Sequence, residues 1–409
     1  MLDQFLAICT VIALLVGIVR YAIGGIIRIV NPNIGVNKDY SYTPTVSILL
    51  PCFNEGSHVY DTVVSINASD YPKDKLEIIV TDDCSVDDSY QWILKAAAEF
   101  SNVVACRNEV NQGKTITILN ALAKSKAEIV TIVDSDTLLH ERAIRELMAC
   151  LGDPRLGAVG GTASVRNPND NALTNFQVFL YYIGFQLGKS IENTTRTVGV
   201  IGGYLFAIRR EIFEDIRPDL EARNWFGVKV KDGEDRFITH NILLRGHGTY
   251  MDMESVCWTT VPNTFRKYWG QQLRWRRTTI RDFFFTLRQI PRHGLNLPMM
   301  SLYVYVLTPI IVLVSIIHVA LMFFINPSDW LSTDRFFIFL ASSFVAIWLV
   351  SLFHPEQAIK NPLKMVVFST WWIVNNLLLA PLALLTLDAD SWGNRDKKKI
   401  ALKPLEETQ

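Results

Sequence analysis

Between residues 44 and 260, short apolar runs alternate with helical stretches, and this alternation is the feature that most constrains the fold. The apolar runs are rich in β-branched residues, which predicts strands, and the stretches between them carry helical patterns. Strands that alternate with helices form a mostly parallel sheet with helices on both faces. We therefore expect an α/β domain. The predicted strands are 45–50, 76–81, 103–107 and 128–133, and the predicted helices are 59–67, 88–100 and 114–123.

Polar residues follow each predicted strand. Glu55 comes after the first strand, Asp82 and Asp83 after the second, Lys114 after the third, and the triplet 134–136 (Asp-Ser-Asp) after the fourth. In sheets of this kind, ligands bind outside the carboxyl ends of the strands. The chain contains neither a Gly-x-Gly-x-x-Gly fingerprint nor a P-loop, which argues against dinucleotide oxidoreductases and P-loop ATPases.

The carboxylates and the lysine at these strand ends fit nucleotide-sugar chemistry. Asp134 and Asp136 can present oxygens to Mg²⁺ or Mn²⁺, which would bridge the two phosphates of the leaving group. Asp82 and Asp83 can accept hydrogen bonds from a base and a ribose, although the same run can also cap the next helix. Lys114 is suited to binding a phosphate. The alternative is a lysine that is simply exposed to solvent at the start of a helix. We place Glu55, Asp82, Asp83, Lys114 and Asp134 among the nucleotide-sugar-binding residues.

A second group of polar residues lies farther along the chain. Asp235 is the candidate general base for an acceptor hydroxyl, and the adjacent Glu234 would raise its pKa in a dry pocket. The alternative is a helix that starts with two acidic residues. In the stretch 271–275, Arg274 can offset charge on a diphosphate. Trp275 can form a flat platform for an acceptor sugar, with Gln271 beside it.

Long apolar segments flank the α/β region, and 49% of the 409 residues are hydrophobic. The segments 5–30, 297–325, 336–353 and 363–387 are long enough to span a bilayer. Three crossings after the domain would place the basic tail 395–399 outside, so we expect the last segment to lie at the interface or against protein. We predict an N-terminal transmembrane anchor (1–32), a cytosolic domain (44–260), amphipathic interfacial helices (261–296), a C-terminal membrane region (297–390) and a cytosolic loop and tail (391–409).

Charge is balanced globally and arranged locally. Lys plus Arg and Asp plus Glu number 40 each, so nothing points to nucleic acid. Between residues 266 and 292 eight basic side chains accompany a single acidic one, Asp282, just ahead of an apolar segment. This is typical of the cytoplasmic side of a membrane. We expect a multi-pass plasma-membrane protein whose catalytic domain is cytoplasmic.

Three motifs in this order resemble the processive family 2 glycosyltransferases, particularly bacterial hyaluronan synthases and also chitin-oligosaccharide synthases. They are 233–236 (Gly-Glu-Asp-Arg), 271–275 (Gln-Gln-Leu-Arg-Trp) and 391–395 (Ser-Trp-Gly-Asn-Arg). The resemblance covers residues 45–395. It implies a GT-A-type fold, a metal at Asp136, a uridine contact at Asp82 and a base at Asp235. It further implies a product channel through the membrane helices, an acceptor-lining loop at Gly203 and a gating loop with Trp392 and Arg395.

The chain also departs from the hyaluronan synthase pattern. Asn394 stands where threonine is usual, and the loop 201–210 lacks Ser-Gly-Pro. The stretch 281–284 (Arg-Asp-Phe-Phe) is more similar to chitin-oligosaccharide synthases. These differences keep the identity of the polymer open.

The resulting expectation is an inverting, metal-dependent β-glycosyltransferase that polymerises UDP-sugars and passes the polysaccharide across the membrane. Its partners would be UDP-sugars, the growing chain and the lipid bilayer. Hyaluronan synthesis from UDP-GlcNAc and UDP-GlcA is the first candidate function. A chitin-oligosaccharide synthase or a glucose/glucuronate capsule synthase is the alternative. A catalytically inactive glycan-binding or secretion component is the alternative from another class.

Overall fold

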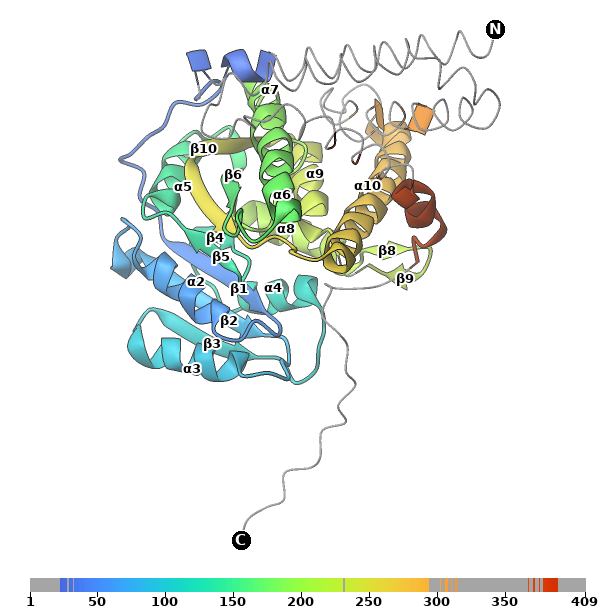
Figure 1. Ribbon diagram of the computed structural model, residues 1–409. Helices are drawn as coiled ribbons and strands as arrows, with labels where there is room; N and C mark the ends of the chain where they lie inside the picture. The colour runs from blue at the N-terminus through green and yellow to red at the C-terminus, as the bar shows by residue number, and fades with distance from the viewer. Residues whose placement is uncertain are drawn as a thin grey trace, which may run out of the picture.

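The computed structural model describes residues 23–27, 29–31, 33–230, 232–293 and 378–388, with scattered residues between 302 and 375. Its centre is an eight-stranded sheet in the order β3-β2-β1-β4-β7-β6-β10-β5 (Figure 1). The strands are β1 (Val46–Cys52), β2 (Leu76–Asp82), β3 (Val103–Arg107), β4 (Ile129–Ile132), β5 (Thr137–Leu139), β6 (Leu156–Val165), β7 (Phe206–Arg209) and β10 (Gly248–Thr259), and a separate hairpin holds β8 (Asn224–Trp225) and β9 (Val228–Lys229).

Helices connect most of these strands, and the predicted helices and strands of the first half agree with the observed ones within two residues. The helices are α2 (His58–Asn67), α3 (Ser89–Glu99), α4 (Lys114–Leu122), α5 (Ala143–Leu151), α6 (Ala172–Tyr182), α7 (Gly188–Thr194), α8 (Arg210–Glu221), α9 (Glu234–Leu244) and α10 (Phe265–His293), and a π-helical turn, η2 (Ile183–Leu187), joins α6 to α7.

The sheet is mixed, which corrects the expectation of a mostly parallel one. Strands β3, β2, β1 and β4 run parallel to one another, and β6 runs parallel to β10. However, β7 is antiparallel to both β4 and β6, and β5 is antiparallel to β10. Antiparallel pairing needs no crossover helix, so the strand–helix alternation that indicates parallel strands does not detect β5 and β7.

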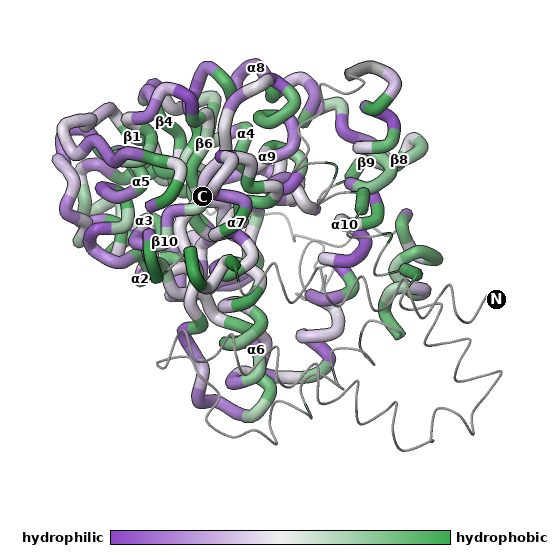
Figure 2. Tube along the Cα trace, turned by 90° about the horizontal axis from the view of Figure 1, so that it is seen from above, coloured by the Kyte–Doolittle hydropathy of each residue, from purple (hydrophilic) through white to green (hydrophobic). Residues whose placement is uncertain are grey.

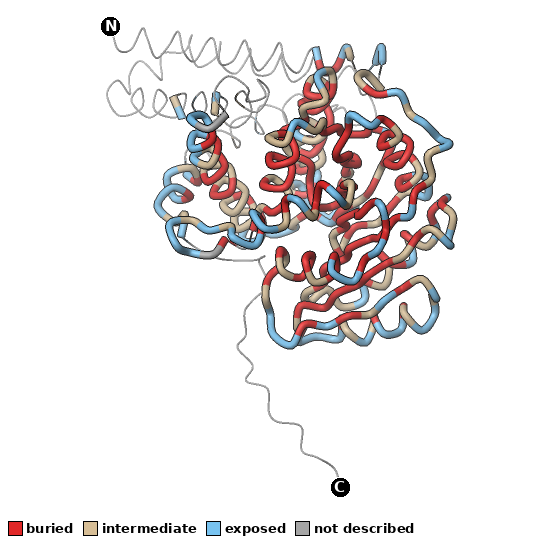
Figure 3. The backbone as a smooth tube through the Cα atoms, turned by 180° about the vertical axis from the view of Figure 1, so that it is seen from behind, coloured by how far each residue is buried: buried red, intermediate tan, exposed pale blue. Residues whose placement is uncertain are grey.

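Helices cover both faces of the sheet, as predicted. Side chains of β1 alternate between the faces: Ile48 and Leu50 belong to a buried cluster with α2, α3 and α5, whereas Leu49 belongs to a cluster with α4, α8 and α9. This alternation follows from the two-residue period of a strand. In Figure 3 the strands form a buried centre, and exposed residues gather on the peripheral segments.

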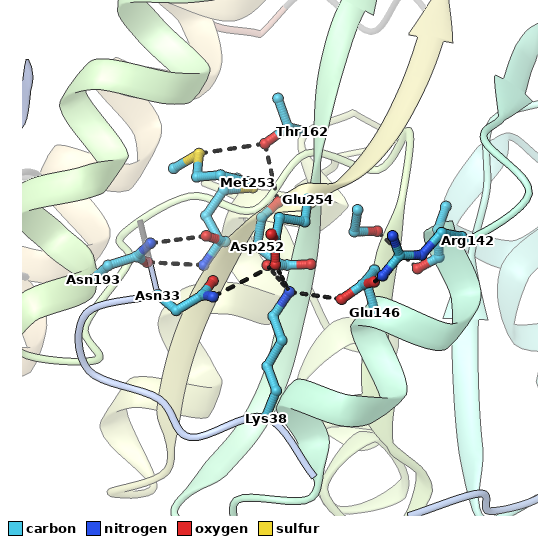
Figure 4. A network of polar contacts seen from close by, with 12 residues as sticks. Asn33, Lys38, Arg142, Glu146, Thr162, Asn193, Asp252, Met253 and Glu254 are labelled. Atoms are coloured by element: carbon cyan, nitrogen blue, oxygen red, sulfur yellow. Dashed lines mark hydrogen bonds and ion pairs between the residues drawn. The ribbon is translucent and has the colours of Figure 1, made fainter. Parts of the chain in front are cut away.

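A buried ion cluster fixes the segment that leads into β1 (Figure 4). The Lys38 ammonium lies 2.8 Å from Glu146 of α5 and 2.9 Å from Asp252 of β10, and it also pairs with Glu254. Asp252 and Glu254 lie where the register of β10 against β6 shifts, between Met251 and Val256. Burial lowers the pKa of Lys38, but the surrounding carboxylates outweigh it and raise the pKa above its usual value. Two carboxylates at the register shift of β10 thus bind Lys38 and fix the segment that precedes β1.

Helix α10 is a single amphipathic helix of 29 residues, where the sequence predicted several interfacial helices. Its trace passes through both hydrophilic and hydrophobic turns in Figure 2. Arg277 and Arg281 were predicted to belong to a basic membrane-facing cluster, but both are buried. Arg281 pairs with Asp232 at 2.6 Å. A pattern of basic residues does not reveal such burial, because the partners that surround the two side chains come from distant segments.

The C-terminal described segment, 378–388, packs against α10. Arg277 donates to the hydroxyl of Thr386 at 3.0 Å, and Arg281 donates to the carbonyl of Leu387 at 2.6 Å. Within the part of the chain that the structure describes, no helix combines the length and apolar character needed to cross a membrane. The predicted spans lie largely outside the described residues, apart from part of the segment 363–387. Trp392 and Arg395 of the predicted gating loop lie outside them altogether.

Candidate active site

The carboxyl ends of β1, β2 and β4 meet at one edge of the sheet because these strands are parallel and adjacent. Glu55 follows β1, and its carboxylate accepts a hydrogen bond from the Ser135 hydroxyl at 3.2 Å. Ser135 lies between Asp134 and Asp136, so the loop after β1 touches the acidic turn after β4. These residues lie together as the sequence predicted.

Asp82 and Asp83 both belong to this edge but have different surroundings. Asp83 is fully buried, and its carboxylate accepts hydrogen bonds from the backbone N–H groups of Gln112 at 2.9 Å and Gly113 at 2.8 Å. Asp82 pairs with Arg107 at 3.0 Å, and burial outweighs this pairing to raise its pKa. Asp83 therefore fixes the turn before α4, whereas Asp82 forms an ion pair with Arg107 at the end of β2.

Lys114, the first residue of α4, connects two parts of the site. Its ammonium lies 2.6 Å from an Asp134 oxygen and 2.8 Å from a Glu234 oxygen. Burial lowers the pKa of Lys114, but the charges of Asp134, Glu234 and Asp235 outweigh it and raise the pKa above its usual value. Lys114 is therefore a permanent cation that holds the end of β4 against the start of α9.

Asp235 lies in the first turn of α9, which begins after Gly233. Gly233 has a φ of +70°, and a Cβ there would lie 2.2 Å from a side-chain carbon of Thr278 on α10, so only glycine fits. The Asp235 carboxylate accepts hydrogen bonds from the backbone N–H groups of Gly203 at 3.3 Å and Arg236 at 2.8 Å. Burial, and then the charge of Glu234, raise the pKa of Asp235 to about 6, although Lys114 opposes them. A carboxylate with this pKa suits proton abstraction near neutral pH.

Gly203 brings the loop before β7 close to both charged groups. A Cβ at this position would lie 2.8 Å from the Lys114 nitrogen, with Glu234 and Asp235 next nearest. Any larger residue would push the lysine aside. The residue predicted to line the acceptor site is thus in direct contact with the candidate base.

Aromatic side chains lie beside the charged residues of the site. The Trp275 ring is 6.5 Å from Phe185 and 6.4 Å from Tyr181, and Phe185 is 5.5 Å from Tyr204 in an edge-to-face arrangement. Burial raises the pKa of Tyr181; the charges of Asp136 and Asp134 add to this, and the charge of Arg274 opposes it. The predicted motif on α10 therefore brings Arg274 and Trp275 to the acidic turn.

Gln271, one turn earlier on α10, has a buried side-chain oxygen without a hydrogen-bond partner.

Sequence reasoning missed Tyr181, Phe185 and Tyr204. The signal that could have indicated Tyr204 is its place directly after the two glycines of the loop 201–210, which lacks Ser-Gly-Pro.

The acidic turn offers oxygen ligands to a divalent cation. Asp136 is half-buried, and Asp134 keeps one carboxylate oxygen on Lys114. Among the described residues, no group of three or more His, Cys, Asp or Glu side chains could hold a metal by itself. Mg²⁺ is usually bound through one or two carboxylates and the phosphates of the substrate, so the donor set fits a cation that arrives with a nucleotide.

Comparison with known proteins agrees with this site. A family model described as "Glycosyltransferase like family 2" matches residues 44–278. A hyaluronan synthase of Streptococcus pyogenes is 27% identical over 388 residues, covering 92% of this chain and 88% of that protein. An N-acetylglucosaminyltransferase of Mesorhizobium japonicum is 27% identical over 363 residues, covering 86% of this chain and 82% of that protein.

A similar fold occurs among solved structures. A mannosyltransferase from Pyrobaculum calidifontis, in complex with GDP-Man and Mn²⁺, aligns with a TM-score of 0.64 and 21% identity, covering 94% of this chain and 99% of that one. This likeness supports the GT-A-type fold.

Proposed function

The chain belongs to the family 2 glycosyltransferases, and from this premise we propose that it is a processive β-glycosyltransferase that polymerises UDP-sugars. The observation that carries the proposal is the position of Asp235. This carboxylate is partly exposed, has a pKa raised to about 6 and touches the loop at Gly203. Such a group can accept a proton from a sugar hydroxyl that lies between the loop and Trp275.

In the proposed reaction, the acceptor oxygen forms a bond to the anomeric carbon of the donor as the bond from that carbon to the diphosphate breaks. Asp235 takes the proton of the acceptor hydroxyl. Arg274 offsets the charge that builds on the departing diphosphate. A divalent cation at Asp136 and Asp134 would supply further electrostatic stabilisation to the leaving group. Lys114 keeps Asp134 and Glu234 in place.

Hyaluronan from UDP-GlcNAc and UDP-GlcA is the leading product, supported by the similarity to the streptococcal enzyme over most of both chains. The rhizobial relative supports a chitin-oligosaccharide product as the second candidate. A glucose/glucuronate capsule polysaccharide is the third. An inactive glycan-binding component is less well supported, since such proteins typically lose a metal or base carboxylate and this chain keeps Asp136 and Asp235.

We further propose that the enzyme is embedded in the plasma membrane with its catalytic domain in the cytoplasm, and that the polymer crosses the bilayer through the same chain. The apolar segments and the basic residues of α10 support this. The tail would fold over the nucleotide, with Trp392 as an apolar cover and Arg395 facing the diphosphate. A cysteine introduced at Ser391 and labelled from each side of sealed vesicles tests the topology, and labelling only from the outside would contradict it.

A product assay tests the function. Purified protein is incubated with UDP-GlcNAc, with or without UDP-GlcA, in Mg²⁺ or Mn²⁺, and the product is digested with hyaluronidase or chitinase. A polymer that needs both donors and is cut by hyaluronidase supports the leading candidate. Release of UDP without any polymer from every donor would rule out the proposed polymerase.

A further inference from the structure

Tyr204 occupies an unusual position beside the candidate base. It follows Gly203 in the loop before β7, and its side chain is only 7% exposed. The ring folds back over Gly202, where a Cβ would lie 2.2 Å from the ring, so the loop needs glycine there to hold the tyrosine. The other side of the ring meets the edge-to-face partner Phe185 at 5.5 Å.

The hydroxyl of Tyr204 has no hydrogen-bond partner in the structure. A buried polar group without a partner destabilises a protein by about 1–3 kcal/mol, so a ligand group that bonds to it would offset that cost. Burial raises the pKa of Tyr204 well above its usual value, with smaller contributions from Cys257, Tyr181, Asp235 and Asp134. The phenol is therefore neutral at physiological pH, and it lies within the electrostatic reach of the candidate base and of the acidic turn.

We propose that Tyr204 turns toward a bound acceptor sugar so that its hydroxyl, which is buried in this structure, forms a hydrogen bond with a hydroxyl group of the sugar, and that Tyr204 is a specificity-determining residue of this chain. The inference rests on the proposed function, because it assumes a saccharide acceptor at Asp235. It goes beyond that function by assigning a contact to Tyr204, in the loop that lacks Ser-Gly-Pro. Tyr204 lies in the loop that touches Asp235, and Phe185 connects its ring to Trp275.

The position favours the acceptor over the nucleotide. The base must face the acceptor hydroxyl, and Tyr204 follows directly the glycine whose N–H binds that base. Asp82 and Asp83, which were predicted to contact the nucleoside, lie together at the carboxyl end of β2. The aromatic faces of Tyr181, Phe185 and Trp275 provide apolar surface for the C–H groups of a sugar ring, and the phenol hydroxyl adds a polar contact.

Tyr204→Phe removes only the oxygen and keeps the ring. The matched control is Tyr250→Phe, because the Tyr250 hydroxyl is also buried without a hydrogen-bond partner but lies near Lys38 and Asp252. Both variants should fold. With saturating UDP-GlcNAc and UDP-GlcA, we expect Tyr204→Phe to raise the KM for hyaluronan tetrasaccharide or N,N′-diacetylchitobiose by roughly 2- to 10-fold, the value of one hydrogen bond. The control should leave this KM unchanged, and UDP affinity should stay the same in both.

A second variant and a binding measurement keep the test decisive. Gly202→Ala should displace the Tyr204 ring and raise the acceptor KM at least as much. Calorimetric titration of the two oligosaccharides into parent and Tyr204→Phe gives an answer even without turnover. If the parent consumes no UDP-sugar but Tyr204→Phe weakens oligosaccharide binding, the proposed function fails and this inference stands. Equal affinities, no oligosaccharide binding by the parent, or equal effects of the Tyr204 and Tyr250 variants would overturn the inference.

Discussion

Two lysines, Lys38 and Lys114, each bind carboxylates from distant elements, and they have different roles. Lys38 binds Glu146, Asp252 and Glu254 where the chain enters the sheet, and Lys114 binds Asp134 and Glu234 at the strand ends. In both clusters, carboxylates from distant elements meet one ammonium group. Both lysines have a raised pKa because these carboxylates outweigh the effect of burial.

The two clusters differ in the exposure of one carboxylate in each, Asp252 beside Lys38 and Asp235 beside Lys114. Asp252 is fully buried, so a substrate has no access to it. Asp235 is partly exposed and faces the loop at Gly203. Burial raises the pKa of both groups. The comparison teaches that a raised pKa does not by itself identify a catalytic carboxylate, because access to a ligand is also required.

The largest effect is expected from Asp235→Asn. Replacing the base should lower the transfer rate by about two to four orders of magnitude while UDP affinity is kept. Asp252→Asn is the control, and it should retain the activity of the parent per folded molecule. Initial rates and calorimetry with UDP provide the measurements. More than about a tenth of the parent activity in Asp235→Asn would contradict its role as the base.

Replacing each lysine by methionine should separate the two clusters. Lys38→Met leaves the buried Asp252 without its cation, while Glu146 keeps Arg142. The substitution should lower the free energy of unfolding by about 3–5 kcal/mol, with KM for the donor unchanged. Lys114→Met should instead lower kcat/KM, because Asp134 and Glu234 lose the group that holds them. Denaturant unfolding and steady-state kinetics test this. The same pattern in both variants would show that the clusters do not differ in role.

The pH dependence should distinguish activity from stability at Asp235. Transfer needs the carboxylate, so kcat/KM should fall about tenfold per pH unit below the pKa of about 6. The folded-state pKa lies above the ordinary aspartate value of 3.8, so the folded protein binds the proton more tightly than the unfolded chain. The contribution of Asp235 to stability is therefore largest at low pH and is lost as pH rises through about 6. Asp235→Asn should remove this slope, and an unchanged slope would show that other groups cause it.

The smallest effect is expected from Arg281→Lys. Arg281 binds Asp232, two residues before Glu234, and the carbonyl of Leu387. A lysine cannot reproduce the planar fork of donors, so we expect a loss of about 1–2 kcal/mol in unfolding free energy. Arg288→Lys, at an exposed position on the same helix, should change it by less than about 0.5 kcal/mol. Equal effects of the two substitutions would show that α10 does not support the loop before Asp235.

The sequence by itself determined the local elements and the positions of the reactive carboxylates. The strands that became β1 to β4 and the helices between them follow from hydrophobic periodicity, which acts over a few residues. Asp134 and Asp136 lie at a strand end and Asp235 at a helix start because short-range patterns define both places. The strand ends could be predicted to meet, since adjacent parallel strands share an edge.

Only the tertiary structure decided which side chains meet across long separations. It brought Lys114 to Glu234, turned Arg281 toward Asp232 and placed Tyr204 against Phe185. It also assigned Asp83 to the turn before α4, and made β5 and β7 antiparallel. Each of these contacts depends on how whole elements pack against one another, and the local pattern of a sequence carries little information about such packing.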